Sequence, residues 1–368
     1  MESISRTKRY SIYLCLTAVC YPLIRYGLVP SYRKKPHSTN RTVVVTGATG
    51  NLGAEIAKQF AARRFRVIMA CRDLEKCKSI RRQIVIETAN RSIACRHLDL
   101  EDIDSINSFV DSVSQSEPHI DILINNAAVK DVKTKELVRY GIEKNYWVNF
   151  VAPFLLTIRL LPKLEESAKI TKDSRVVNVT GWPSRRWDVK LDDINFDARG
   201  YDGKIAYRQS KLALAYFTLL LDKFNREKRN CVYVYAADPY FRRVMPSLFR
   251  TTTTWESFYQ TIREYFAMAP EMAVGSIMRG ALEEVSDDSG RVYSLFGRVW
   301  KWGKKGPISD LMKAGYVWNS AAEILLNISD KSKLDIDSNL GNQEKLQAGN
   351  NNAGSVDVGS VLPGKVSA

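Results

Sequence analysis

Metal-binding residues are scarce in this chain of 368 residues, which contains three histidines and six cysteines. The cysteines form no Cys-x-x-Cys pair and show no zinc-ligand spacing; they stand at positions 15, 20, 71, 77, 95 and 231. The sequence therefore argues against a zinc site, and we predict no metal. Because Cys71 and Cys95 lie in apolar runs, we expect both to be free core thiols in reducing surroundings.

Acidic residues are few relative to basic ones, 40 Asp and Glu against 55 Lys and Arg, which gives a formal net charge of +15. The excess is concentrated at the N-terminus, where residues 1–41 contain eight Lys or Arg and one acidic residue, Glu2. Such a head suits anionic membrane lipids, whereas a nucleic-acid-binding protein is expected to carry its basic residues on the folded domain. We predict a membrane partner and no nucleic-acid partner.

The composition, 45% hydrophobic and 26% charged, is that of a globular protein and excludes a polytopic membrane protein. One segment of the head, residues 12–29, carries Arg25 as its only charge and is just long enough to cross a bilayer. We predict a membrane anchor or an interfacial hairpin here; a cleaved targeting segment and a helix folded onto the domain are the alternatives. Basic residues flank both sides, so the positive-inside rule gives no orientation.

Short β-branched runs alternate with helical patterns from residue 42 onward. The first run, TVVVTG at 42–47, is followed by a helical pattern at 54–64 and a second apolar run at 65–71. The alternation continues through strands predicted at 120–128 and 174–180. Strands that alternate with helices in this way predict right-handed crossovers and a parallel sheet covered on both faces. The predicted fold class is α/β, a Rossmann-type doubly wound parallel sheet in a single domain.

The chain divides into three predicted regions. Residues 1–40 form the anchor or targeting segment with its basic linker, and residues 41–330 form the domain. Residues 331–368 are poor in aromatic residues and rich in Asn, Gly and Ser, so they bury too little apolar surface to order themselves. We predict that this last region is a disordered tail.

A glycine-rich loop follows the first predicted strand directly and opens a helix in TGATGNLGAEIAKQF, residues 46–60. In this context the glycines allow a sharp turn and a close approach to a pyrophosphate, while the helix N-terminus offers amide donors and a partial positive charge. The loop therefore predicts a phosphate-bearing cofactor. The residues predicted to hold it are Gly47, Thr49, Gly50, Asn51, Leu52 and Gly53.

The end of the second predicted strand, VIMACRD, indicates which cofactor is bound. NAD-binding sites usually place an acidic residue here to bind the ribose 2′-hydroxyl, and that charge would repel a 2′-phosphate. Cys71 stands at this position instead, and Arg72, whose guanidinium can pair with a phosphate, follows it. NADP(H) is therefore favoured over NAD(H).

Tyr207 and Lys211 stand at i and i+4 at the start of an amphipathic helical pattern, so both are expected on one helix face. They follow the glycine loop, NNAA at 125–128 and VNFVAPFLLT at 148–157, in this order. With this combination the chain resembles the short-chain dehydrogenase/reductase superfamily over residues 41–329. The segments VIMACRD, SKLALAYFTLLL and SGRVYS are most similar to the retinol dehydrogenase group and its WW-domain oxidoreductase relatives.

The resemblance implies a role for each matching residue. Tyr207 would be the acid or base that moves a proton to or from the substrate oxygen, and Lys211 would bind the nicotinamide ribose and lower the pKa of the tyrosine. Asn149 would hold a relay water and orient Lys211. The further residues implied to contact the cofactor are Asn125, Ala127, Asp99 and Pro239.

The chain departs from the family pattern where a serine binds the substrate oxygen. The family strand ends in a motif like VNVSS, whereas VNVTG here places Thr180 at the first serine and Gly181 at the second. Thr180 and Ser184 are the candidate substitutes. Loss of one donor to a developing oxyanion costs about a hundred- to a thousandfold in rate, so the glycine alone does not exclude activity.

Two further departures fall in DPYFRRV, residues 238–244. Tyr240 stands where the family has a glycine beside the cofactor, and Val244 stands near a threonine that helps to hold the nicotinamide amide. The following residues, up to 270, form the substrate lid in this group. Their many aromatic residues suggest a lipophilic substrate, or else simply pack under a long loop.

These features predict an NADP(H)-dependent oxidoreductase acting on a lipophilic alcohol or carbonyl such as a retinoid, a steroid or a fatty aldehyde. The alternative, favoured by Gly181, Tyr240 and Val244, is a catalytically impaired pseudoenzyme that binds nucleotide or lipid as a scaffold or regulator. We expect association with the membrane of the endoplasmic reticulum, a mitochondrion or a lipid droplet, with the domain facing the cytosol. The resemblance also implies a homodimer, although no sequence feature marks its interface.

Overall fold

The computed structural model describes residues 41–130, 132–181, 190–239, 273–283, 290, 292–293, 299–300 and 311–343. Several predictions made from the sequence fall on residues outside these ranges. They concern the anchor at 12–29, Ser184, Tyr240, Val244 and the lid up to residue 270.

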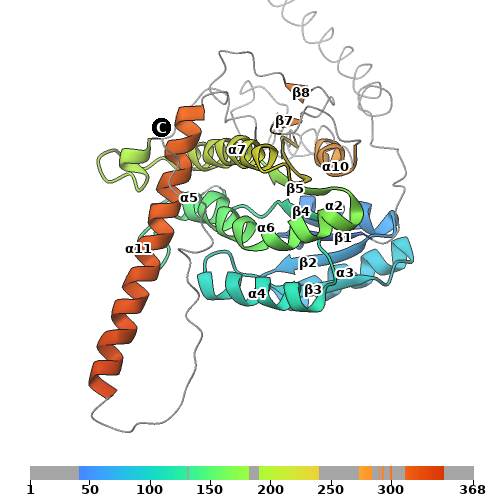
Figure 1. Cartoon of the computed structure of the whole chain (residues 1–368), viewed down its shortest axis with the longest axis horizontal. Coiled ribbons are helices and arrows are strands. Elements are labelled where there is room, and N and C mark those ends of the chain that lie inside the picture. Colours follow the sequence, from blue (N-terminus) through green and yellow to red (C-terminus); the bar gives the residue numbers. More distant parts are fainter. Residues whose placement is uncertain are drawn as a thin grey trace, which may run out of the picture.

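Within the described residues, eight strands form one sheet in the order β3-β2-β1-β4-β5-β6-β7-β8 (Figure 1). Neighbouring strands are parallel from β3 to β7, and β8 pairs antiparallel with β7. The predicted doubly wound α/β fold is confirmed. The strands are β1 (Thr42–Thr46), β2 (Arg66–Cys71), β3 (Ile93–His97), β4 (Ile122–Asn125), β5 (Ser174–Val179), β6 (Val232–Ala237), β7 (Val292–Tyr293) and β8 (Val299–Trp300).

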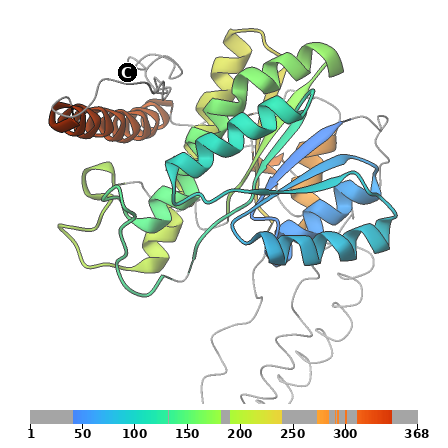
Figure 2. The ribbon, with the colours of Figure 1, turned by 90° about the horizontal axis from the view of Figure 1, so that it is seen from below.

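Helices lie on both faces of this sheet, as Figure 2 shows. One core cluster packs α2, α3 and α10 on one face, and a second packs α4, α6, α7 and α11 on the other. The strand residues between the two clusters are almost all buried, which explains their continuous apolar runs. The helices are α2 (Asn51–Ala62), α3 (Leu74–Thr88), α4 (Ile103–Ser116), α5 (Lys144–Tyr146), α6 (Ala152–Thr171), α7 (Gly203–Glu227), α10 (Gly275–Leu282) and α11 (Leu311–Gln343), with a π-helical turn η2 (Trp147–Val151) and a 3-10 turn η4 (Leu191–Asp193).

The continuous helix from α5 through η2 and α6, Lys144–Thr171, is long and apolar enough to cross a membrane. Its most apolar window is 78% buried inside the domain, and Phe150, Phe154 and Leu160 belong to the core. It is the only such helix among the described residues, and its burial is that of a core helix.

Helix α11 is attached to the domain through Trp318. The buried indole contacts the rings of Phe154 on α6 and of Phe217 and Phe224 on α7, with centroids 4.9, 5.7 and 5.1 Å away. Aromatic side chains of this size contribute much of the core energy. The sequence places the end of the domain at residue 330, whereas α11 continues to Gln343.

The sequence prediction that Cys95 is a free thiol is wrong. Cys95 on β3 forms a disulfide with Cys77 on α3, while Cys71 at the end of β2 is free and buried. The pattern along the chain did not reveal the pair because the two cysteines are 18 positions apart, and the crossover from α3 to β3 brings them together.

Candidate functional site

A cavity of about 770 Å³ opens at the carboxyl ends of β1, β2, β4 and β5. The strand order reverses between β1 and β4, because the chain adds β2 and β3 on one side of β1 and then crosses to the other side. Ligands of open α/β sheets bind at such a switch point, where the loops that follow neighbouring strands diverge.

The glycine loop forms one wall of the cavity, and two of its positions require glycine. A Cβ added to Gly53 would lie 2.2 Å from the carbonyl oxygen of Gly47. Gly47 has a φ of +63°, and a Cβ there would lie 2.8 Å from the Cα of Ala127. At Gly50, the N-cap of α2, the nearest atom would be 3.5 Å away. The loop therefore packs closely against the end of β4 and leads directly into the N-terminus of α2.

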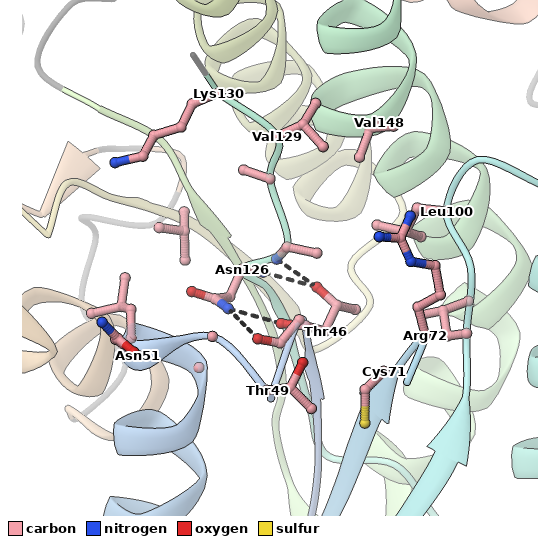
Figure 3. A pocket seen from close by; sticks show the side chains of 18 of the residues that line it. Thr46, Thr49, Asn51, Cys71, Arg72, Leu100, Asn126, Val129, Lys130 and Val148 are labelled. Atoms are coloured by element: carbon pink, nitrogen blue, oxygen red, sulfur yellow. Dashed lines mark hydrogen bonds between the residues drawn. The ribbon is translucent and has the colours of Figure 1, made fainter. Parts of the chain in front are cut away.

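Hydrogen bonds from the end of β4 to the end of β1 fix this arrangement (Figure 3). The backbone N–H groups of Asn126 and Ala127 both donate to the Thr46 hydroxyl, at 3.0 Å each. The Asn126 side-chain amide donates to the Thr46 carbonyl at 2.9 Å and to the Gly47 carbonyl at 3.4 Å. Thr46 and Asn126 thus position the loop, and both line the cavity.

Arg72 follows β2 at another side of the cavity, with its side chain 68% exposed. Its Nη1 donates to Oε1 of Glu101 at 3.2 Å. The other carboxylate oxygen of Glu101 lies 3.3 Å from Nζ of Lys144, which also pairs with Glu136 at 3.1 Å. Arg72 and Glu101 both line the cavity. The exposed Arg72 guanidinium at the cavity edge is therefore held by the carboxylate of a neighbouring lining residue, Glu101.

Tyr207 and Lys211 enter the cavity from the first turns of α7. The helix begins where the Asp202 carboxylate accepts hydrogen bonds from the backbone N–H groups of Lys204 and Ile205, at 2.7 and 3.2 Å. Nζ of Lys211 lies 5.9 Å from the centre of the Tyr207 ring and donates to the Val179 carbonyl at 2.8 Å. Burial lowers the pKa of Lys211 to about 7, because desolvation penalises the ammonium form.

Asn149 occupies the middle of the π-helical turn η2 and is fully buried. Its side chain accepts from the Val129 N–H at 2.8 Å and donates to the Val129 carbonyl at 2.9 Å. It also donates to the Ser210 hydroxyl at 3.0 Å, and that hydroxyl donates to the Tyr207 carbonyl at 2.8 Å. Asn149 therefore positions the segment after β4 and reaches α7 through Ser210.

Thr180 lies at the end of β5, at the position of the first serine of the family motif. Its side chain is almost fully buried, and its hydroxyl donates to the Ala237 carbonyl at 3.3 Å. Its backbone N–H donates to the same carbonyl at 2.9 Å. The Thr180 hydroxyl is thus occupied by a hydrogen bond that joins the ends of β5 and β6. Gly181, the next residue, offers no side-chain donor.

Most residues singled out from the sequence line this one cavity. They are Gly47, Thr49, Gly50, Asn51, Leu52, Gly53, Arg72, Asp99, Ala127, Thr180, Tyr207, Lys211 and Pro239. Two do not line it: Asn149, described above, and Asn125, whose side-chain amide donates to Thr157 at 2.9 Å and to Asn178 at 2.8 Å inside the core.

Sequence reasoning missed other lining residues, notably Lys76, Glu101, Asn126 and Lys130. The motif NNAA was a signal for Asn126, because this residue stands between Asn125 and Ala127, which were both predicted to contact the cofactor. Glu101 stands two residues after Asp99 in the loop after β3 and belongs to no motif, so nothing in the sequence marked it.

Known proteins resemble this chain over the same region. The sequence profile of the short chain dehydrogenase family matches residues 41–185. Retinol dehydrogenase 13 of Homo sapiens is 35% identical over 276 residues, which cover 73% of this chain and 79% of that protein. Retinol dehydrogenase 12 of Homo sapiens is 32% identical over 310 residues, covering 82% and 94%.

A solved structure shares the fold. The crystal structure of an uncharacterized protein from Mycobacterium paratuberculosis superposes with a TM-score of 0.60 and 28% identity, covering 77% of this chain and 92% of that one. The glycine loop, the switch-point cavity, the Tyr207/Lys211 pair and these relatives lead to one conclusion: the chain belongs to the short-chain dehydrogenase family, and within it is related to the retinol dehydrogenases.

Proposed function

We propose that this protein is an NADP(H)-dependent oxidoreductase that interconverts a lipophilic alcohol and its carbonyl compound. The observation that carries the proposal is that Tyr207 and Lys211 line the same cavity as the glycine loop and Arg72. Such chemistry requires the proton-transferring group and the cofactor-binding loop to share one cavity, and the shared cavity of Tyr207 and the glycine loop supports these roles.

The residues of the cavity fit a dinucleotide phosphate. Gly47 and Gly53 lie where no side chain could fit, so backbone amides and the positive end of the α2 dipole are left to face a pyrophosphate. The exposed guanidinium of Arg72 suits a 2′-phosphate, and Lys76 adds a second cation to the same wall. Cys71 stands where NAD-binding sites usually have an acidic residue that binds the ribose, and the absence of that carboxylate supports NADP(H) over NAD(H).

Tyr207 and Lys211 would carry the proton transfer. A bound nicotinamide would supply or accept the hydride. The Tyr207 hydroxyl would pass a proton to the oxygen of a carbonyl substrate or take one from an alcohol. Lys211, when charged, would favour the tyrosinate form of Tyr207 through its nearby positive charge. Because the pKa of Lys211 is about 7, its charge should vary with pH near neutrality.

The substrate class is proposed from the relatives and the sequence. Retinol, which two of the relatives are named for, is a lipophilic alcohol, and such substrates partition into membranes. We propose that residues 12–29 hold the protein at the membrane of the endoplasmic reticulum, a mitochondrion or a lipid droplet, with the domain in the cytosol. This arrangement would deliver a membrane-dissolved substrate to the domain.

A second candidate function, a nucleotide- or lipid-binding pseudoenzyme, is favoured by one observation. Gly181 has no side-chain donor for a substrate oxygen, and the neighbouring Thr180 hydroxyl already donates to Ala237. The loss of one such donor weakens catalysis by about 3–4 kcal/mol. A favourable substrate could still turn over with Tyr207 and Lys211 alone.

The test is a titration of the full-length protein in detergent with NADPH and with NADH, followed by nucleotide fluorescence. All-trans-retinal or a long-chain aldehyde is then added and cofactor oxidation is recorded. Tighter binding of NADPH than of NADH, together with oxidation, supports the proposal. Binding without oxidation across several lipophilic carbonyls supports the pseudoenzyme, and absence of nucleotide binding contradicts both the cofactor and the enzyme proposals.

A further inference from the structure

Three cysteines from three different elements converge beside the candidate cofactor site. Cys71 ends β2, Cys77 lies in the first turn of α3, and Cys95 lies on β3. Their sulfur atoms all lie within 4.8 Å of one another. Cys77 and Cys95 form the disulfide, and Cys71 is the free third thiol.

The register of the sheet explains why the three meet. β2 and β3 are parallel neighbours, with Met69 opposite Cys95, and α3 crosses back over them from β2 to β3. The Cys71 thiol donates to the Met69 carbonyl at 3.3 Å, and Sγ of Cys77 lies 3.8 Å from the same oxygen. The cluster is therefore fixed by strand pairing and helix packing.

The cluster is mostly buried: Cys95 is partly exposed, and Cys71 borders the cavity. Cys71 and Cys77 are 3% and 0% exposed and belong to the apolar core on this face of the sheet, with Cys95 packed against it.

The ligand set matches a thiophilic metal ion. The cluster contains only sulfur donors, with neither carboxylate nor imidazole, and thiolates select ions such as Zn²⁺ and Cu⁺ over Mg²⁺ or Ca²⁺. A Zn–S bond of about 2.3 Å in tetrahedral geometry places sulfur atoms about 3.8 Å apart. Once the disulfide is open, small side-chain rotations would bring three sulfurs to that spacing.

We propose that Cys71, Cys77 and Cys95 form a zinc-type site in the reduced protein, with three thiolates as ligands. A phosphine reductant and water open the disulfide to two thiols, the phosphine being oxidised to its oxide. The divalent ion then binds the three sulfurs and releases three protons to solvent. Because Cys71 and Arg72 both line the cavity, the ion would join β2, α3 and β3 directly behind the wall that carries Arg72.

The test uses Co²⁺ as a coloured substitute for Zn²⁺. The full-length protein is reduced anaerobically with a phosphine, freed of excess reagent and titrated with Co²⁺. We expect thiolate-to-cobalt charge-transfer absorption that saturates at one equivalent and disappears when Zn²⁺ is added. The oxidised protein, with its disulfide intact, should give no such absorption.

Matched variants separate this cluster from the other cysteines. The background Cys15→Ser/Cys20→Ser/Cys231→Ser keeps only the three clustered thiols and should bind Co²⁺ like the wild type. Adding Cys71→Ser to it should weaken Co²⁺ binding more than about a hundredfold, since even outer-shell partners contribute 10- to 100-fold. Metal should also protect three cysteines of the wild type from alkylation, which is a readout independent of the variants.

Three results would overturn the proposal. They are equal Co²⁺ binding with and without Cys71, loss of binding in the background variant, and absence of charge-transfer absorption in the fully reduced wild type. The last result would mean that the three reduced cysteines do not form a metal site. Circular dichroism of each variant checks that a loss of binding does not come from unfolding.

Discussion

The guanidinium of Arg72 and the carboxylate of Glu101 form an ion pair at the edge of the cavity, with Nη1 and Oε1 3.2 Å apart. Both residues line the cavity, and Glu101 also pairs with Lys144. A 2′-phosphate that binds Arg72 must therefore compete with Glu101 for it.

Glu101→Gln should tighten NADPH binding by up to about fivefold, because a partly exposed ion pair is worth about 0.2–1 kcal/mol. NADH binding should change little, since NADH lacks the phosphate. Fluorescence titrations with both nucleotides measure the effect. Glu136→Gln is the matched control, because Glu136 pairs with Lys144 but does not line the cavity; equal effects of the two substitutions would contradict this role of Glu101.

Gly53→Ala should destabilise the protein by more than about 2 kcal/mol, because the new Cβ would lie 2.2 Å from the Gly47 carbonyl oxygen and the backbone must shift. Gly50→Ala, where the nearest atom is 3.5 Å away, should leave the folded state nearly as stable. Thermal unfolding of both variants checks the difference. Similar unfolding temperatures would mean that the loop is less tightly packed than the structure shows.

Lys211 makes the stability of the unliganded protein depend on pH. Its pKa is lowered from 10.5 to about 7 in the folded state, so between these values the unfolded chain binds more protons and the free energy of unfolding rises with pH. Replacing the buried lysine by methionine removes this dependence. Lys211→Met should therefore be more stable than the wild type at pH 7, by at least about 1 kcal/mol, and the gap should shrink toward pH 10.

Differential scanning calorimetry from pH 6.5 to pH 10 measures that gap. Lys204→Met replaces an exposed lysine on the same helix and should show no comparable trend. A gap for Lys211→Met that stays constant with pH would show that Lys211 keeps an ordinary pKa in the folded protein.

Gly181→Ser should restore a hydroxyl beside the substrate oxygen. If the missing donor limits catalysis, kcat should rise about tenfold or more while NADPH affinity stays the same. Gly200→Ser is the control, because that glycine is exposed with open space around it. No gain in kcat for Gly181→Ser would mean that a different group supports the substrate oxygen.

The parts predicted well from the sequence are those encoded in contiguous residues. The strand, glycine turn and helix of residues 42–62 follow from local patterns, and so does the pairing of Tyr207 with Lys211 on one helix. The resemblance assigned Asn149 to Lys211, whereas the structure joins its side chain to Val129 and Ser210. That detail depends on how the π-helical turn packs, which no linear pattern encodes.

The cysteine cluster and the Arg72–Glu101 pair could not be predicted for a related reason. Each depends on the parallel pairing of β2 with β3, which brings together residues from separate segments of the chain. Neither cysteine spacing nor a single glutamate in a loop carries that information. Packing between elements decided both features.

The turnover of Tyr207→Phe with NADPH and a lipophilic aldehyde tests the central proposal most directly. The variant should bind NADPH as tightly as the wild type but turn over at least about a hundredfold more slowly, because the proton-transferring hydroxyl is lost. Tyr316→Phe, an exposed tyrosine on α11, should leave both properties unchanged. Two results would contradict the proposed enzyme. One is a Tyr207→Phe variant that turns over as fast as the wild type, and the other is a wild type that binds NADPH but does not oxidise it with any lipophilic carbonyl tested.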